Sequence, residues 1–367
     1  MGNESEIARY RLINQQIASS RHKSAAELVA GFGAMQAQDY SNALWAIGLR
    51  LPDATEKEIE QAVADRKIVR TWPMRGTLHF VAAEDVRWML ALLTPRIVAG
   101  SASRCRELEL DDKIFARCGK LFASALKGGQ QFTREAMMQL LESDGITAGS
   151  QRGYYILWRL AQEGVLCFGP RSGKQQTFTL LDEWVVKSKK MDHDAAVAEL
   201  ARRYFTSHGP ATLLDFAGWS GLKVSDARAG LESITRELSS MSVDDTVYWM
   251  PRELPDAAEG VLPEGYLLPG FDEYLLGYKE RSAVLELRHA QKVVPGSNGI
   301  FLPTLMIDGR IAGTWKRAVK KNAVVITISP FATVKKIEKK LAAAAGRYSR
   351  FTGLPVEIQS AASKTGL

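Results

Sequence analysis

The order of apolar and polar positions divides the middle of the chain, residues 112–184, into helical stretches followed by short strands. The stretches and strands lie, in order, at residues 114–126, 135–141, 154–160, 165–168 and 176–180. Apolar residues that recur every three or four positions predict amphipathic helices for the first three. The last two flank a Gly-Pro-Arg-Ser-Gly-Lys turn and predict a β-hairpin. Three helices followed by a hairpin with a basic tip are the elements of a winged helix-turn-helix unit.

Residues at the ends of these stretches support the predicted boundaries. Thr133 and Ser150 stand where the N-caps of the second and third helices are expected. Their side chains are suited to that place because Ser and Thr accept hydrogen bonds from the N–H groups of a first helical turn. Gly164 is expected to end the third helix before the hairpin begins.

Two further segments follow a similar order. Residues 194–250 predict helices and strands at 198–205, 212–217, 225–234, 238–243 and 246–250. The hairpin turn of this copy is Asp244-Asp245, and its acidity argues against a phosphate contact there. Residues 7–93 form a looser version. There, Ser24 is expected to cap a helix at 25–35, Thr55 a helix at 56–67, and residues 75–81 predict a strand.

From about residue 260 the pattern changes to short β-like runs between glycines and prolines. These runs lie at residues 262–270, 300–307, 309–315 and 323–328. A basic helix is predicted at 332–345, with Lys335, Lys336, Lys339 and Lys340 at spacings that gather charge along one side. A solvated face is the commoner use of such charge, and a phosphate-contacting face is the alternative.

These patterns predict an α+β fold with three tandem winged helix-turn-helix units and a β-rich C-terminal segment. The predicted boundaries are 1–100, 110–185, 192–250 and 260–367, the last including the basic helix. A chain of 367 residues exceeds the roughly 100–200 of one ordinary domain, so several packed units are expected.

Charge and composition narrow the classes of partner. Lys and Arg number 48 against 41 Asp and Glu, a formal net charge of +7, which favours polyanions and nucleic acid first. No apolar run reaches the roughly 18–20 residues of a membrane span. The opening Met-Gly-Asn-Glu-Ser-Glu has no basic start and no apolar stretch, so we expect a cytoplasmic protein without a membrane partner.

Cysteine and histidine spacings favour no metal site. The three cysteines, Cys105, Cys118 and Cys167, form no Cys-x-x-Cys pair, and the five histidines are scattered. We therefore expect no metal and no cofactor. The tryptophans that lie within apolar patterns are expected in the core rather than stacked on bases. They are Trp72, Trp158, Trp219 and Trp315.

Four short segments carry a resemblance to a known family. They are residues 33–39 (GAMQAQD), 72–79 (WPMRGTLH), 268–272 (LPGFD) and 309–315 (GRIAGTW). Together, and in this order, they resemble the winged-helix DNA glycosylases of the AlkZ and YcaQ type. The resemblance implies tandem winged-helix units in a concave arrangement that cups DNA. It also implies release of alkylated bases such as N7-alkylguanine and, for the AlkZ type, unhooking of interstrand cross-links.

The resemblance extends to a catalytic signature. Gln36-Ala37-Gln38 matches the Gln-x-Gln of the AlkZ type, while Asp39 comes one position too late for the Gln-x-Asp of the YcaQ type. Glutamine is a poor general base. An N7-alkylated purine, however, already carries a positive charge and leaves as a neutral base. Two amide oxygens can orient the attacking water and stabilise the cationic sugar. The hypothesis is a monofunctional DNA glycosylase that acts on cationic N7-alkylated purines through Gln36 and Gln38.

The spacing of the glutamines adds a structural expectation. Residues two apart point about 200° apart around an α-helix but share one face of an extended segment. If both glutamines serve one site, the backbone around residues 35–39 should not be helical.

Several basic residues are candidates for DNA contacts. They are Arg70, Arg75 and His79 in the first unit, Arg171 and Lys174 at the hairpin tip of the second, and Lys335 and Lys336 near the C-terminus. A basic hairpin tip commonly meets phosphate. For Arg75 and His79 the sequence slightly favours structural roles, as an ion-pair partner and as a satisfied strand histidine.

The expected partner is double-stranded DNA with alkylated bases, bound by a monomer. The alternative is a non-enzymatic winged-helix regulator, although such proteins usually dimerise on a two-fold site. An RNA-binding or chromatin-like protein would share the charge but have no use for paired glutamines. Lyase activity, the preferred adduct and base flipping stay open.

Overall fold

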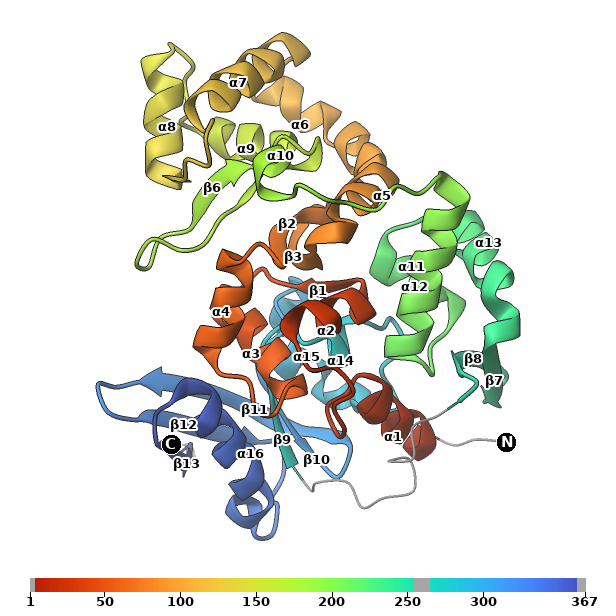
Figure 1. Cartoon of the computed structure of the whole chain (residues 1–367). Helices are drawn as coiled ribbons and strands as arrows, with labels where there is room; N and C mark the ends of the chain where they lie inside the picture. Colours follow the sequence, from red (N-terminus) through yellow and green to blue (C-terminus); the bar gives the residue numbers. More distant parts are fainter. Residues whose placement is uncertain (1–3, 254–264, 362–367) are drawn as a thin grey trace.

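The N-terminal unit lies at the centre of the molecule, and the other parts of this α+β chain surround it (Figure 1). The computed structural model describes residues 4–253 and 265–361. In the view of Figure 1, residues 86–184 lie above the central unit, residues 193–251 beside it, and the C-terminal sheet below it.

The central unit begins with helix α1. A second helix, a short strand, two more helices and a β-hairpin then follow in the chain. Its elements are α1 (Glu4–Asn14), α2 (Ala25–Phe32), β1 (Ala34–Gln36), α3 (Tyr40–Arg50), α4 (Glu56–Ala64), β2 (Ile68–Met74) and β3 (Thr77–Ala82). Ser24 and Thr55 cap α2 and α4 as predicted. The prediction that the helix beginning at residue 25 continues to residue 35 is wrong, because α2 ends where Gly33 turns the chain at a φ of 79°. Residues 34–36 then pair with β3.

The second unit follows two connecting helices and repeats this order. The elements are α5 (Val86–Gly100), α6 (Ala102–Glu107), α7 (Asp112–Ala125), β4 (Phe132–Thr133), α8 (Arg134–Ser143), α9 (Arg152–Gln162), β5 (Leu166–Phe168), β6 (Thr177–Leu180) and α10 (Leu181–Trp184). Thr133 caps α8 as predicted. Ser150 does not cap α9, because the chain is left-handed at both Ser150 and Gln151 and the helix begins one residue later.

The first two units share one sheet. In the described part of the chain its strand order is β1-β3-β2-β5-β6-β4, with β2 and β5 joined through Arg70 and Phe168. The two hairpins therefore lie side by side, and Arg70 stands at their junction.

The third unit lies against the other side of the centre. Its elements are α11 (His193–His208), α12 (Leu213–Ser220), α13 (Val224–Ile234), β7 (Leu238–Val243) and β8 (Thr246–Pro251). An isolated bridge between Ala211 and Trp249 stands where the other units have their first strand. The predicted helices and hairpin of this segment are confirmed to within five residues at each end, and both ends of β7 agree to the residue.

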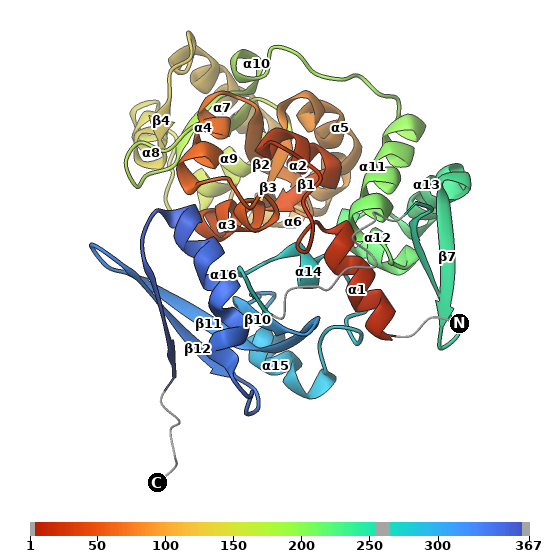
Figure 2. The same ribbon diagram turned by 60° about the horizontal axis from the view of Figure 1, so that its bottom comes forward.

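The C-terminal region is a sheet with one long helix. Its elements are β9 (Gly265–Leu268), α14 (Glu273–Leu276), α15 (Ala290–Val293), β10 (Thr304–Ile307), β11 (Arg310–Val319), β12 (Val324–Pro330), α16 (Ile337–Thr352) and β13 (Val356–Ser360). The strand order, for described residues, is β13-β12-β11-β10-β9. Figure 2 shows α16 lying along this sheet, and its Phe351 reaches Gly48 of α3.

The basic helix is displaced from its predicted place. It begins at Ile337 rather than at 332, so Lys335 and Lys336 precede it, and Lys336 is left-handed with a φ of 53°. The register is set by the apolar stripe that the helix buries, whose members recur every three or four residues. They are Leu341, Ala344, Tyr348 and Phe351.

The core prediction holds for the four tryptophans, because Trp72, Trp158, Trp219 and Trp315 are buried. The three cysteines are buried free thiols. Within residues 4–253 and 265–361, no helix is long and apolar enough to cross a membrane. The same residues contain no cluster of three or more His, Cys, Asp or Glu that could hold a metal ion.

Candidate active site

The two glutamines lie in the connection between β1 and α3. Gln36 is the last residue of β1, Gln38 follows in an irregular turn, and Asp39 caps α3 by accepting from Asn42 N. The backbone here is not helical, as expected if both side chains serve one site. Gln36 is 7% exposed, whereas Gln38 is exposed. One glutamine is therefore built into the protein and the other faces solvent.

Both amide oxygens accept one backbone hydrogen bond. Oε1 of Gln36 accepts from Ala37 N at 2.9 Å, and Oε1 of Gln38 accepts from Leu78 N at 3.3 Å. Nε2 of Gln36 lies 3.5 Å from Oγ1 of Thr77. A carbonyl oxygen has two lone pairs, so each amide can accept a second hydrogen bond, for example from water.

Arg70 holds the peptide between the two glutamines. Its Nε and Nη2 donate to the Ala37 carbonyl at 3.0 and 2.8 Å, and Nη1 donates to Oε1 of Gln176 at 2.9 Å. Burial lowers the pKa of Arg70 to about 10, which still leaves it charged at neutral pH. The guanidinium faces protein oxygens, so the DNA contact predicted for Arg70 stays a prediction, and the observed contact is structural.

Arg75 lies in the turn between β2 and β3, and His79 of β3 is the partner of Gln36 in the β1–β3 pair. Arg75 donates to the Trp219 carbonyl, and its Nη2 lies 3.5 Å from Nε2 of His79. His79 is fully buried, with Nδ1 2.9 Å from the Thr77 carbonyl oxygen. Burial first, and the neighbouring Arg75 second, lower the pKa of His79 to about 3. These contacts favour the structural interpretation of both residues.

Glu273 is a site residue that the sequence patterns did not single out. Its Oε1 accepts from Gln36 N at 2.8 Å, and its Oε2 accepts from Trp219 Nε1 at 3.0 Å. Nε2 of His208 lies 3.4 Å from the same Oε2. Burial alone would raise the pKa of Glu273, but the contacts of His208 and the Gln36 N–H outweigh it and hold the pKa well below its ordinary value.

One signal could have pointed to Glu273. It directly follows the 268–272 segment that carries the family resemblance. Asp272 of that segment makes a fully buried bidentate pair with Arg50 of α3, at 2.9 Å for both contacts. The Arg50–Asp272 pair therefore holds the start of α14 against α3, the helix that follows the glutamines. Glu273 is the first residue of α14 and so lies next to Gln36.

Comparisons with known proteins agree with this geometry. A model of the family described as "DNA glycosylase AlkZ-like" matches residues 29–351. The chain belongs to the AlkZ-like DNA glycosylase family. It is 27% identical to the "Interstrand DNA cross-link repair glycosylase" of Streptomyces sahachiroi, covering 96% of this chain and 98% of that protein. The solved structure of Streptomyces sahachiroi DNA glycosylase AlkZ matches with a TM-score of 0.78 and 25% identity, over 98% of this chain and 100% of the other.

As an AlkZ-like glycosylase the chain is an enzyme that acts on DNA, so the remaining basic candidates matter. Arg171 pairs with Glu60 and lies over the Tyr40 ring, 4.7 Å from its centroid. Lys174 is exposed in the turn of the second hairpin, and Lys335 and Lys336 are exposed before α16. Of the two residues predicted for the hairpin tip, Lys174 is the more accessible to phosphate.

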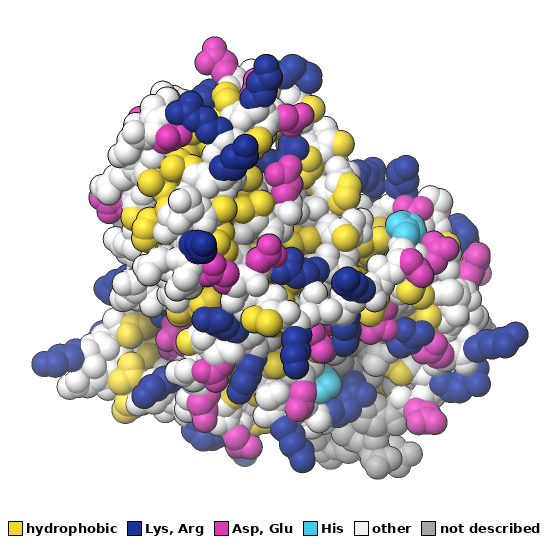
Figure 3. Space-filling view, turned by 45° about the horizontal axis from the view of Figure 1, so that its top comes forward, with side chains coloured by type: hydrophobic (Ala, Val, Ile, Leu, Met, Phe, Trp, Pro, Cys, Tyr) yellow, Lys and Arg dark blue, Asp and Glu magenta, His cyan; other side chains and the backbone are white. Residues whose placement is uncertain are grey.

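The face of the AlkZ-like chain drawn in Figure 3 carries mixed charge. Lys and Arg are interspersed with Asp and Glu there, without one continuous basic stripe. On this face, positive side chains therefore alternate with negative ones. The charge on this face does not by itself mark a DNA-binding surface.

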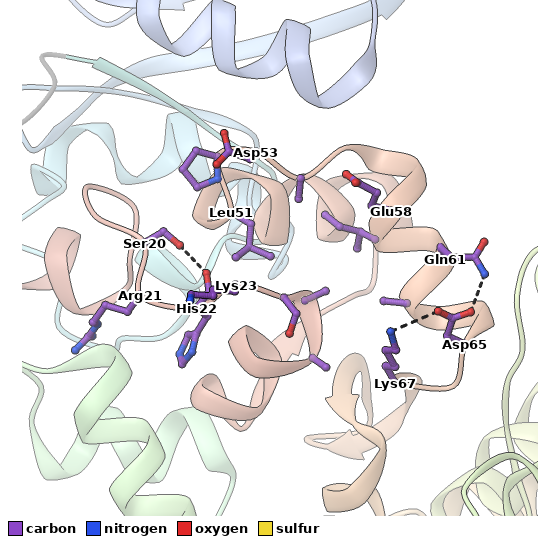
Figure 4. Close-up of a pocket in the computed structure, with 17 residues that line it drawn as sticks. Ser20, Arg21, His22, Lys23, Leu51, Asp53, Glu58, Gln61, Asp65 and Lys67 are labelled. Atoms are coloured by element: carbon purple, nitrogen blue, oxygen red, sulfur yellow. Dashed lines mark hydrogen bonds and ion pairs between the residues drawn. The ribbon is translucent and has the colours of Figure 1, made fainter.

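An open pocket of about 710 Å³ lies away from the glutamines, between the 20–26 segment and α4 (Figure 4). None of the predicted site residues lines it. Several polar groups that line the pocket form hydrogen bonds or ion pairs with one another. Ser20 donates to the His22 carbonyl, and Asp65 accepts from Gln61 and pairs with Lys67. Its size alone therefore does not make it the catalytic site of this AlkZ-like enzyme.

Proposed function

We propose that the chain hydrolyses the N-glycosidic bond of cationic N7-alkylated purines in DNA, with Gln36 and Gln38 as its catalytic residues. Interstrand cross-links built on such purines are included, as the name of the Streptomyces relative suggests. One observation carries the proposal: the two glutamines share a non-helical segment whose backbone is held by a buried cation, Arg70, and a buried anion, Glu273. A preorganised pair of amides needs this kind of support.

The chemistry follows from the charge of the substrate. A cationic base leaves as a neutral molecule, so the enzyme needs no general acid to expel it. The amide oxygens have free lone pairs for a water molecule and can direct their dipoles at the sugar as it becomes positive. Neither step requires a cofactor. A neutral base such as uracil would gain much less from this site.

We further propose that the chain binds duplex DNA as a monomer in the cytoplasm. In our proposal the three helix–hairpin segments are winged-helix units, with boundaries near 1–100, 110–185 and 192–250, and 260–367 completes a concave DNA surface. The β2–β3 turn at Gly76 accepts from Trp158 Nε1. The wing of the first unit is thus packed against the second, and the exposed turn with Lys174 remains to meet phosphate.

Release of 7-methylguanine from a methylated duplex tests the proposal. Wild type, Gln36→Ala, Gln38→Ala and the double variant are compared at one low salt concentration, with duplex binding measured in parallel. The control is Gln130→Ala, which removes an exposed glutamine of the second unit. We expect release by wild type and the control, with loss of about 100-fold or more in the double variant at unchanged DNA affinity.

A cross-linked duplex extends the test to bulkier lesions. If wild type binds both substrates but releases no base from either, the proposal is wrong and a non-enzymatic role is favoured. Equal rates for wild type and the double variant would leave a glycosylase whose catalytic residues lie elsewhere.

A further inference from the structure

Glu273 connects three parts of the chain at one buried carboxylate. It lies on α14 and is 1% exposed. Its oxygens face Gln36 N of the first unit and, from the third unit, Trp219 Nε1 and His208 Nε2. A carboxylate accepts hydrogen bonds and donates none, so it can receive all three N–H groups at once.

The surrounding groups are consistent with an anion at this position. His208 is fully buried, and burial lowers its pKa, so the ring is neutral at neutral pH. Its Nδ1 lies 2.8 Å from Ser207 Oγ, which itself lies 2.7 Å from the Arg203 carbonyl oxygen. In the tautomer that carries its proton on Nε2, the ring donates to Glu273. The guanidinium of Arg75 is also close enough to interact with the Glu273 charge.

The carboxylate and Arg70 hold the catalytic segment from its two ends. Glu273 binds the N–H group of Gln36, while Arg70 binds the carbonyl of Ala37. The N–H of Ala37 lies between these two points and donates both to the Leu78 carbonyl, at 2.7 Å, and to the Gln36 amide oxygen, at 2.9 Å. Glu273 and Arg70 therefore hold the peptides on either side of the one that binds the Gln36 amide oxygen.

We propose that Glu273 is a positioning residue for glycosidic-bond hydrolysis, which fixes the Gln36 backbone by accepting its N–H and requires two acceptor oxygens to do so. The inference rests on the catalytic role proposed for Gln36. It assigns the acceptor oxygens of Glu273 to the reaction, through Gln36, rather than to folding alone. A displacement of about 1 Å at a catalytic group can reduce a rate by about 100-fold, so loss of this support should be visible in turnover.

The test uses one substitution that removes an acceptor and a second that removes a donor. In Glu273→Gln the side chain has one oxygen and one NH₂, so either Gln36 N or Trp219 Nε1 faces another donor. In Glu273→Gln with Trp219→Phe, the indole N–H is gone. The new amide oxygen can then turn to Gln36 N, and the NH₂ can donate to His208 Nε2 after a tautomer change.

Single-turnover release of 7-methylguanine at saturating DNA is the readout, with duplex affinity and thermal unfolding measured alongside. We expect Glu273→Gln to lose about 100-fold in rate with unchanged affinity. The double variant should recover at least tenfold over Glu273→Gln. Glu135→Gln, an exposed change on α8, is the matched control for loss of one negative charge.

The outcomes separate this inference from the proposed function. Wild-type turnover by Glu273→Gln overturns it, as does a folded double variant that is no faster than Glu273→Gln. If Glu273→Gln does not fold, Trp219→Phe is combined with Glu273→Gln and, separately, with Glu273→Ala. Retained rate with Gln and a loss of about 100-fold with Ala support the inference, and equal rates for the two combinations overturn it. Wild-type turnover by Gln36→Ala would instead contradict the proposed catalytic residue.

Discussion

At the scale of single residues, burial decides what each polar side chain of the site can do. Arg70 and Gln36 are 5% and 7% exposed, and the side chains of both form hydrogen bonds with the backbone of Ala37. Gln38 and Lys174 are exposed and remain accessible to a ligand. The charge of a residue in the sequence therefore predicts DNA contact only where the fold leaves that residue at the surface.

The salt dependence of DNA binding distinguishes these two kinds of basic residue. Each phosphate contact contributes about one unit to the slope of log affinity against log salt concentration. We expect Lys174→Ala to reduce the slope by about one unit and Arg70→Gln to leave it unchanged, because Arg70 binds the Ala37 carbonyl. Titrations of an undamaged duplex at salt concentrations between roughly 50 and 200 mM measure this slope. The affinities of DNA-binding proteins fall steeply over that range of salt.

The opposite pattern would reverse the assignment. A reduced slope for Arg70→Gln in a folded protein would make Arg70 a phosphate contact, as its charge alone suggested. No change for Lys174→Ala would remove the second hairpin tip from the DNA surface. Thermal unfolding of Arg70→Gln checks that the β1–α3 connection still folds.

At the scale of elements, the sequence predicted the helices well and their ends less well. Apolar spacing and the caps Thr133 and Thr55 placed α8 and α4, because these signals are local. The end of α2 was wrong because residues 34–36 pair with β3, a partner some forty residues away. The start of α16 was wrong because lysine spacing was used, while the buried stripe from Leu341 to Phe351 sets the helix.

The same division applies to the site. Gln36 and Gln38 could be proposed from the sequence because their signal is a short motif. Glu273, His208 and Trp219 could not be found from spacing, because they come from α14, α11 and α12 and meet only in the folded chain. Local pattern predicts elements and motifs, whereas the groups that hold the Gln36 segment depend on tertiary contacts.

The contact between α3 and α14 gives a prediction at this scale. Arg50 and Asp272 form a bidentate pair and are 0% and 3% exposed. Asp272→Asn would leave the buried guanidinium without its counter-ion, which costs about 3–5 kcal/mol. Glu237→Gln is the control, because its pair with Arg202 is solvent-exposed and such pairs contribute about 0–1 kcal/mol.

Urea unfolding measures both variants at neutral pH. Equal losses for the two variants would mean that the buried pair adds nothing beyond an ordinary surface contact. A larger loss for Asp272→Asn would show that the 268–272 segment holds the C-terminal region onto the first unit.

At the scale of the whole molecule, distant segments converge on a polar centre that solvent does not reach. His79 of the first unit and His208 of the third are both fully buried. Arg11 of α1 donates to the Pro210 carbonyl, and Gln15 donates to the Glu273 carbonyl. Because one polar centre joins these units, a change in its charge should affect the stability of the chain as a whole.

Acid should therefore destabilise the folded enzyme before its surface carboxylates are protonated. His79 has its pKa lowered from 6.5 to about 3, chiefly by burial, and the pKa of His208 is lowered for the same reason. Below pH 6.5 the unfolded chain binds protons at these rings and the folded chain does not, so the free energy of unfolding falls as the pH falls. His79 alone should lower it by about 1.4 kcal/mol at pH 5.5 relative to neutral pH, and His208 acts in the same direction.

Urea unfolding at pH 7.5 and pH 5.5 measures this difference. His193 is exposed. His193→Gln should therefore leave the difference unchanged. His79→Gln should be less stable at pH 7.5, since the contact with the Thr77 carbonyl is altered, yet should lose about 1.4 kcal/mol of the pH difference. An unfolding free energy that is equal or higher at pH 5.5 would mean that these rings are solvated or paired when protonated. The polar centre would then be open to water, and the rigid support proposed for Gln36 would lose its physical basis.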